Sequence, residues 1–295
     1  MAVSAALQAH LDTGTTTLCR CWRVRRRDGV LMGFTDHDLD LSFDGTVFRA
    51  DTGLTAQALQ QTTGLSVDNT EALGALSSSA VTEADLAAGR FDGAEVESWL
   101  VNWSDVLQRH LTFKGTLGEV VTSGGQFRAE LRGQSEVLNR ARGRAFQPLC
   151  SADLGDVECG VDLDAPGVSG VTTVAQIKSA QNLVVAGLDA YTAALFERGR
   201  LEVLSGAAQG LKATIKSDTV MTGARELVLW EEVRAAIAVG DQVRLRPGCN
   251  KRAETCRTRF NNFLNFRGFP HIPGEDWLMA YPTRNGRNDG GSRNR

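Results

Sequence analysis

The sequence lacks the features that mark membrane proteins and most enzymes. No stretch reaches the roughly 18 consecutive apolar residues of a membrane-spanning helix, and residues 1–17 lack the apolar core of a signal peptide. It contains no H-E-x-x-H, G-x-S-x-G or G-x-x-x-x-G-K-[ST] motif and no dinucleotide-binding fingerprint. Its histidines stand far apart, at His10, His37, His110 and His271. We therefore expect a protein that is not an enzyme, has no stable membrane insertion and folds in the cytoplasm.

The composition is that of a soluble globular protein, with 42% hydrophobic and 23% charged residues among 295. This length corresponds to about two domains of roughly 150 residues. The formal net charge of -3 hides an asymmetry, because nine Lys or Arg and four Asp or Glu follow from Cys249 onward. The remainder of the chain is acidic, which disfavours phosphate, so we expect no specific nucleic-acid binding.

Short strands dominate the pattern of the first half. Residues 18–26 alternate apolar and polar side chains, and Asp28-Gly29 after them is a hairpin turn signal. A second hairpin is expected at Phe43-Asp44-Gly45. Further strands are expected at residues 65–69, 94–103, 110–121 and 126–132. Short helices are expected at residues 2–12, 82–89, with Thr82 as the N-cap, and 134–141.

An acidic stretch rich in turn formers, residues 148–168, marks a junction between two domains. After it, strands are expected around residues 171–187, 200–216 and 226–231 and in the string GDQVRLRPG. The predicted fold is mainly β (α+β). It comprises an N-terminal β-barrel or sandwich with short helices at residues 1–148, a smaller C-terminal β-domain at 149–280 and a disordered tail at 281–295.

Four of the six cysteines form two pairs that flank the second domain, Cys150 and Cys159 before it and Cys249 and Cys256 after it. A reducing cytoplasm disfavours disulfides, so grouped thiols point to a metal. Eight residues separate the first pair and six the second, which matches neither the C-x-x-C zinc knuckle nor the common ferredoxin run. The spacing leaves open an iron–sulfur cluster, a zinc ion or four separately buried thiols.

Charge around the second pair favours the cluster over zinc, because four thiolates on a four-iron cluster leave a net negative charge. The basic residues there are Lys251, Arg252, Arg257 and Arg259. We expect the acidic residues between 153 and 164 to face this basic segment across the cysteines. Apolar residues at helical spacing also predict a short helix packed beside the site. They are Phe260, Phe263, Leu264 and Phe266.

Two other groups resemble metal sites less well. Cys19 and Cys21 share one face of a predicted strand and have no partner nearby in sequence, so buried small hydrophobic side chains are expected there. Asp36, Asp38 and Asp40 alternate as in a calcium loop, but the Gly and Glu that an EF-hand requires are missing. We expect these aspartates on a solvated strand face or turn.

The C-terminal string GCNKRAETCRTRFNNFLNFRGFPHIPGED resembles the C-terminal signature of phage tail-tip hub proteins of the lambda type and of gene transfer agents. That signature has two cysteines, an Arg/Phe/Asn-rich stretch and a Gly-Phe-Pro turn. The strings GFTDHDLDLSFDG, GLSVDNTEALGAL, AAGRFDGAEVESWLVNW and FRAELRGQSEVLN extend the resemblance, which runs from about residue 32 to residue 278.

The resemblance implies a structural role in a phage-like particle assembled in the bacterial cytoplasm. It implies a homotrimeric hub at the tail tip or baseplate that joins the distal tail protein ring to the central tail fibre or tip protein. In lambda-like members, four cysteines of the C-terminal domain hold an iron–sulfur cluster. By this resemblance, Cys150, Cys159, Cys249 and Cys256 would bind a 4Fe-4S cluster, with zinc as the alternative. The alternative to the hub role is an iron–sulfur redox or DNA-processing enzyme, or a zinc-stapled scaffold module.

Overall fold

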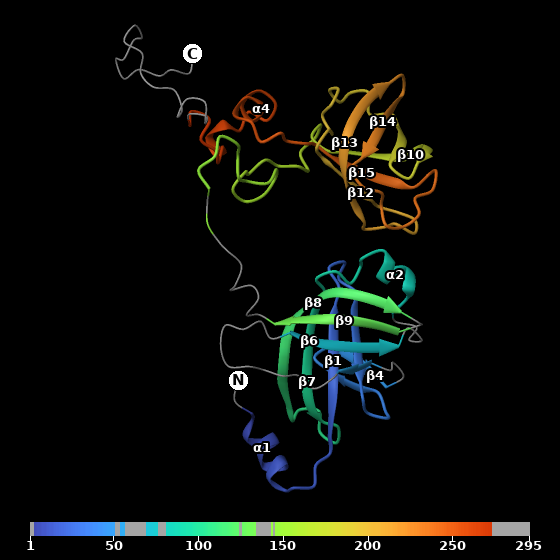
Figure 1. The fold of residues 1–295 in the computed structure, drawn as a ribbon, viewed down its shortest axis with the longest axis vertical. Coiled ribbons are helices and arrows are strands. Elements are labelled where there is room, and N and C mark those ends of the chain that lie inside the picture. The colour runs from blue at the N-terminus through green and yellow to red at the C-terminus, as the bar shows by residue number, and fades with distance from the viewer. Residues whose placement is uncertain are drawn as a thin grey trace, which may run out of the picture. The chain divides into compact units, whose positions relative to one another are not determined.

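The computed structural model describes residues 3–50, 54–56, 69–75, 81–123, 126–133, 143 and 145–272. The chain divides into two compact units, residues 1–141 and 142–295. Both units consist mainly of strands with a few short helices (Figure 1), which confirms the predicted mainly β class. No helix in the described ranges is long and apolar enough to span a membrane. The helix predicted at 134–141, the tail at 281–295 and most of the strand at 65–69 lie outside the described residues.

One sheet of nine strands forms the N-terminal unit, in the order β3-β4-β2-β1-β7-β8-β9-β6-β5. All neighbouring pairs are antiparallel except β2 and β4, which are parallel. The strands are β1 Leu18–Arg25, β2 Leu31–Thr35, β3 Leu41–Phe43, β4 Thr46–Arg49, β5 Leu54–Ala56, β6 Asn69–Ala75, β7 Glu95–Asn102, β8 Arg109–Ser123 and β9 Gln126–Gly133.

The turns and caps of this unit follow their sequence signals. Asp28-Gly29 connects β1 to β2, and Asp44 and Gly45, with φ of 48° and 69°, connect β3 to β4. Both predicted hairpins are therefore confirmed. Helix α2 (Glu83–Ala87) begins after Thr82, whose side chain accepts a hydrogen bond from the Asp85 N–H, as predicted. Helix α1 spans Ala5–Asp12.

The N-terminal sheet is buried on both faces, because successive side chains of a strand point to opposite sides. On β1, Trp22 and Val24 enter one apolar cluster, whereas Cys19 and Cys21 enter another with Trp99. Cys19 and Cys21 are 6% and 0% exposed, which confirms them as buried hydrophobic side chains. The described strands form a single sheet with a core on each face, and the closed barrel belongs to the C-terminal unit instead.

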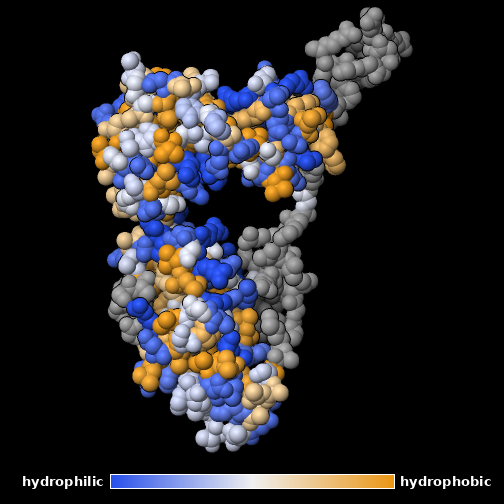
Figure 2. All heavy atoms as spheres, turned by 180° about the vertical axis from the view of Figure 1, so that it is seen from behind, coloured by the Kyte–Doolittle hydropathy of each residue, from blue (hydrophilic) through white to orange (hydrophobic). Residues whose placement is uncertain are grey.

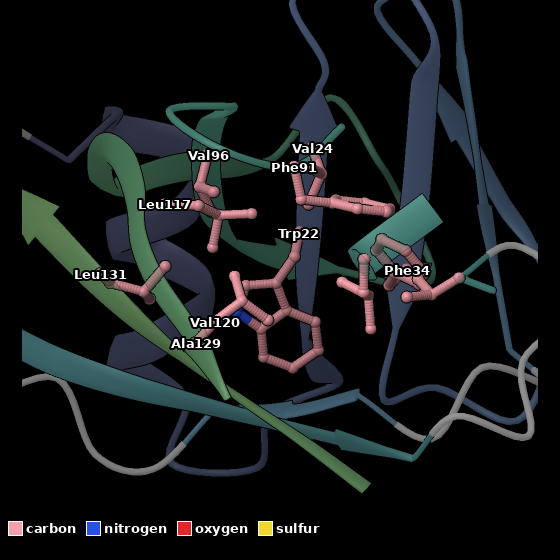
Figure 3. Close-up of a pocket in the computed structure, with 11 residues that line it drawn as sticks. Trp22, Val24, Phe34, Phe91, Val96, Leu117, Val120, Ala129 and Leu131 are labelled. Atoms are coloured by element: carbon pink, nitrogen blue, oxygen red, sulfur yellow. The ribbon is translucent and has the colours of Figure 1, made fainter. Parts of the chain in front are cut away.

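The larger N-terminal core surrounds a small apolar cavity of about 30 Å³, into which the Trp22 indole projects between Phe34 and Val120 (Figure 3). Leu117 and Leu131 also line it. The indole Nε1 is buried and has no hydrogen-bond partner among the residues that the structure describes. Within the described residues, this core therefore contains a buried N–H donor without an acceptor, whereas most buried polar groups in proteins are hydrogen-bonded.

Six strands close into a barrel in the C-terminal unit, in the order β10-β11-β14-β13-β12-β15. The strands are β10 Gly170–Ser179, β11 Asn182–Ala186, β12 Arg200–Val203, β13 Lys212–Met221, β14 Ala224–Leu229 and β15 Gln242–Arg246. Its interior is apolar, with Val185, Phe196, Leu201, Ile215 and Leu245 fully buried. On the face that Figure 2 shows, apolar residues of both units are scattered among hydrophilic ones. The barrel thus buries its own core.

After the barrel, the chain forms helix α4 (Ala253–Thr258) and the 3-10 turn η1 (Phe263–Asn265). The predicted helix on the Phe260–Phe266 face is wrong, because α4 starts before Cys256 and ends at Thr258. Asn261 has a left-handed φ of 46°, which ends helical continuity. Phe263 and Phe266 stack with their ring centroids 5.7 Å apart, whereas Leu264 is 98% exposed.

Candidate metal centre

The two segments that flank the barrel bond to each other and bring their cysteines together. The Cys150 N–H donates to the Lys251 carbonyl at 2.8 Å, and the Arg267 N–H donates to the Cys150 Sγ at 3.3 Å. The Phe269 N–H donates to the Gln147 carbonyl at 2.9 Å. The first cysteine pair is therefore held against the second.

Asn262 links one cysteine of each pair. Its side-chain Nδ2 donates to the Cys159 carbonyl at 2.6 Å and lies 3.6 Å from the Cys159 Sγ. Its backbone carbonyl accepts from the Cys256 Sγ at 3.3 Å. The Asn262 N–H also donates to the Cys256 carbonyl at 3.0 Å. The sequence alone does not predict this role of Asn262, because no spacing rule distinguishes it from its neighbour Asn261.

Cys249 is oriented by a tight turn just beyond the barrel. The Lys251 N–H donates to the Cys249 Sγ at 3.3 Å, and Lys251 itself has a left-handed φ of 62°. The Lys251 ammonium pairs with Asp153 at 2.9 Å and bonds the Ala152 carbonyl. The expected pairing of the acidic loop with the basic segment therefore occurs through Lys251, whereas the Arg257 guanidinium lies 4.3 Å from the centre of the Phe263 ring.

The four thiols influence one another electrostatically. Burial raises the pKa of the Cys256 thiol, and the nearby Cys150, Cys249 and Cys159 raise it further. Cys159 and Cys256 are buried, whereas Cys150 and Cys249 are half-buried. All four thiols are free. Crowded thiols resist ionisation unless a cation compensates their charge, which is the electrostatic condition of a metal-binding site.

Donor spacing constrains which metal group these thiols fit. In the ranges that the structure describes, no group of three or more His, Cys, Asp or Glu side chains is arranged to hold one metal ion. Tetrahedral zinc with bonds of about 2.3 Å needs its sulfurs within roughly 4 Å of one another. Three of the four sulfurs receive N–H donors, as thiolates of iron–sulfur clusters do.

Comparison with known proteins identifies the family. A family model described as "baseplate hub protein, N-terminal attachment domain" matches residues 4–162, more than half of the chain. A second model, described as "phage conserved hypothetical protein BR0599", matches residues 194–276. No curated protein matches the chain. The first match contains Cys150 and Cys159 and the second contains Cys249 and Cys256.

A solved structure agrees with the family models. A chain of the "virion of native gene transfer agent (GTA) particle" is 51% identical, with a TM-score of 0.91, and the match covers 98% of this chain and 99% of that one. The predicted resemblance and the predicted place in a phage-like particle are both confirmed. The chain therefore belongs to the baseplate hub proteins of phage-like tails, whose N-terminal attachment domain the first family model describes.

Proposed function

We propose that this protein is a structural hub in the baseplate of a gene transfer agent particle. It acts as a homotrimer that joins the distal tail protein ring to the central tail fibre or tip protein. The similarity to a gene transfer agent virion chain over 98% of this chain is the observation that carries this proposal. A family model for an attachment domain over residues 4–162 supports the joining role.

One end of the N-terminal unit offers apolar side chains for assembly. His37 and Trp103 stack with ring centroids 5.0 Å apart and so connect two loops. On these loops, Leu39 is 68% and Leu107 is 78% exposed, and Trp103 is 41% exposed. Exposed apolar side chains grouped in this way favour a protein interface. We assign this surface to contacts with other baseplate subunits.

Analytical ultracentrifugation of the purified chain tests the hub proposal, followed by cryo-electron microscopy of tails. We expect a trimer and density for three copies at the baseplate. Leu107→Asp is expected to weaken assembly, whereas Val239→Asp, at a 64% exposed position of the other unit, is its matched control. A chain that stays monomeric and joins no tail particle would contradict the proposal.

We also propose that Cys150, Cys159, Cys249 and Cys256 bind a 4Fe-4S cluster, with zinc as the alternative. Support comes from the convergence of the two pairs, the N–H donors to three sulfurs and the Lys251 charge beside them. Such a cluster supplies four metal–sulfur bonds that join both flanks of the barrel. Lys251 and Asn262 would orient the thiolates through their hydrogen bonds.

Iron, sulfide and zinc analysis of protein purified without air tests the cluster. We expect about four iron and four sulfide per chain with a broad visible absorption. Cys159→Ser should lower iron content, whereas Cys19→Ala, a buried thiol of the other unit, should leave it unchanged. About one zinc per chain would establish the alternative. Protein that contains neither iron nor zinc would show that the four cysteines are ordinary thiols and would contradict the metal site.

A further inference from the structure

A polar groove runs along the barrel beside the cysteine segments. Its volume is about 410 Å³, within the range of small-ligand sites. One wall is the outer face of β12, β13 and β15, which are neighbours in the barrel (Figure 1). The other wall includes Asp153 and Asp156 from the loop before the barrel. Cys249 and Lys251 of the candidate metal centre also line the groove, whereas the arginines on its barrel wall take no part in the proposed cluster.

Two rows of side chains cross the barrel wall of the groove, because residues directly opposite in antiparallel strands share a face. In one row, Glu202 of β12 lies opposite Lys212 of β13 and Arg244 of β15. Glu202 contacts the Lys212 Nζ and the Arg244 Nη1, each at 3.4 Å. This row carries one net positive charge, but both of its cations contact a carboxylate.

The neighbouring row of side chains contains two arginines and no carboxylate. Arg200 of β12 lies opposite Thr214 of β13 and Arg246 of β15. Arg200 forms no ion pair with any described residue, and the carboxylate nearest to Arg246 is the largely exposed Asp164, 3.9 Å away. Like charges directly opposite each other destabilise a sheet. This row therefore gains from a bound anion, and the guanidinium fork suits carboxylate or phosphate oxygens.

A third arginine is fixed beside the row by a strained backbone. Arg198 has a left-handed φ of 63°, and its N–H donates to the Ile215 carbonyl at 2.8 Å. The segment that contains Arg198 packs so closely against residue 248 that a Cβ on Gly248 would lie 1.7 Å from the Glu197 carbonyl oxygen. Strain maintained by such packing is common at binding sites, where it positions a group before the ligand arrives.

The other side chains near the arginines suit a ligand that carries hydroxyl groups and an apolar ring face. Asp156 is anchored by the Cys159 and Asp153 N–H groups at 2.6 and 2.7 Å, so its carboxylate can accept a ligand hydroxyl but repels an anion. Trp230 adjoins Thr214 at the far end of the row, where its N–H donates to the Thr214 carbonyl at 3.0 Å. Its side chain is 57% exposed, and the Lys216 ammonium lies 5.2 Å from the centre of its ring, so the opposite face of the indole is the flat apolar surface offered to a ligand.

We propose that this groove binds an acidic sugar, a polyhydroxylated ring that carries a carboxylate or phosphate group. The anionic group binds Arg198, Arg200 and Arg246. The hydroxyls donate to Asp153 and Asp156, and a neighbouring ring of an oligosaccharide packs on Trp230. A free anion satisfies only the first of these contacts, and a neutral sugar satisfies only the others.

Isothermal titration calorimetry on the full chain at 150 mM salt, a concentration of roughly physiological strength, tests the proposal with trigalacturonate, glucose 6-phosphate, a neutral galactose oligomer and inorganic phosphate. We expect binding of one or both acidic sugars, at least tenfold tighter than the neutral oligomer and inorganic phosphate. Arg200→Gln should weaken it about tenfold, because it removes a charge-assisted contact. Arg244→Gln, which removes a cation already paired with Glu202, should change it less than twofold.

Several outcomes would overturn the assignment. One is the absence of binding by millimolar acidic sugars, and another is binding of inorganic phosphate or polyglutamate as tightly as the acidic sugars. Equal losses of affinity in Arg200→Gln and Arg244→Gln would show that binding depends on the overall positive charge and not on a specific contact with Arg200. Melting temperatures of both variants must equal that of the wild type, and quenching of Trp230 fluorescence, lost in Trp230→Phe, provides a second readout.

Discussion

Arg225 and Asp218 form a fully buried ion pair in the barrel, with 2.6 Å between the Arg225 Nη1 and the Asp218 Oδ2. Arg225 also donates to the carbonyls of Leu188 and Thr192 at 3.2 and 3.1 Å. Asp218 accepts from the Phe196 N–H at 3.0 Å. The pair therefore attaches the loop between β11 and β12 to the barrel.

Asp218→Ala should lower the free energy of unfolding by about 3–5 kcal/mol, because it leaves the Arg225 charge buried without its partner. Calorimetry or urea denaturation measures the loss. Adding Arg225→Met to this variant should recover part of the stability. Glu202→Ala, at a partly exposed ion pair on the same barrel, should cost only about 1 kcal/mol or less. Equal losses at the two sites would contradict this account.

Asn262→Ala should lower the metal content of the anaerobically purified protein and lower its melting temperature. The reason is that the substitution removes the side-chain amide that donates to the Cys159 carbonyl, whereas the backbone contact with Cys256 is kept. Loss of a ligand-orienting contact typically costs about 10–100-fold in metal affinity. Leu264→Ala, at a 98% exposed position two residues away, is the control. Full metal occupancy in Asn262→Ala under competition with a chelator would refute the role of Asn262.

Acid should weaken the N-terminal unit through Glu97. Burial acts to raise the pKa of Glu97, but hydrogen bonds from Arg23 and Lys114 outweigh it and hold the pKa below its usual value. Because the pKa is lower in the folded state, this stabilisation is present at neutral pH and is lost as the pH falls through that lowered value.

Melting temperatures between pH 7 and pH 3 measure this effect. Glu97→Gln should lower stability by on the order of 1 kcal/mol at pH 7 and should flatten the decline below about pH 4. Glu95→Gln, at an exposed position on the same strand, should preserve the wild-type profile. Parallel profiles for the wild type and Glu97→Gln would show that Arg23 and Lys114 do not stabilise the folded state through Glu97.

Gly248→Ala should destabilise the C-terminal unit by about 1–3 kcal/mol, the usual cost of overpacking. The new Cβ would meet backbone, 1.7 Å from the Glu197 carbonyl oxygen and 2.6 Å from the Gly199 nitrogen. Gly143→Ala, with no heavy atom within 4 Å of the new Cβ, should be neutral. Urea denaturation compares the two variants. An unchanged midpoint for Gly248→Ala would mean that the 197–199 segment moves aside easily.

Local signals made much of the fold predictable. Asp28-Gly29 and Asp44-Gly45 define hairpins because their backbone conformations suit tight turns, and Thr82 caps its helix with its own hydroxyl. The parallel pairing of β2 with β4, with Gly33 opposite Phe48, depends on contacts that no local pattern encodes. A Cβ at Gly33 would lie 2.4 Å from the Val47 carbonyl oxygen, which explains that glycine only once the pairing is known.

The candidate site was predictable only as a set of residue types. Two cysteine pairs around a domain indicated a shared site, and the resemblance selected the four residues. Asn262 could not be identified, because its role depends on the chain turning back at Asn261. The charge imbalance around Arg200 was equally hidden, since it arises from strand register rather than from sequence neighbours.

The hydrogen bonds between the flanks of the barrel determine how the C-terminal unit bears mechanical load. Gln147 bonds Phe269, and Cys150 bonds Lys251, so the chain segments that enter and leave the barrel are fastened to each other. Tension applied along the chain passes directly across this fastening. The barrel strands lie inside the closed loop and stay unloaded until the fastening opens, so the unit can transmit a pull without unfolding its own core.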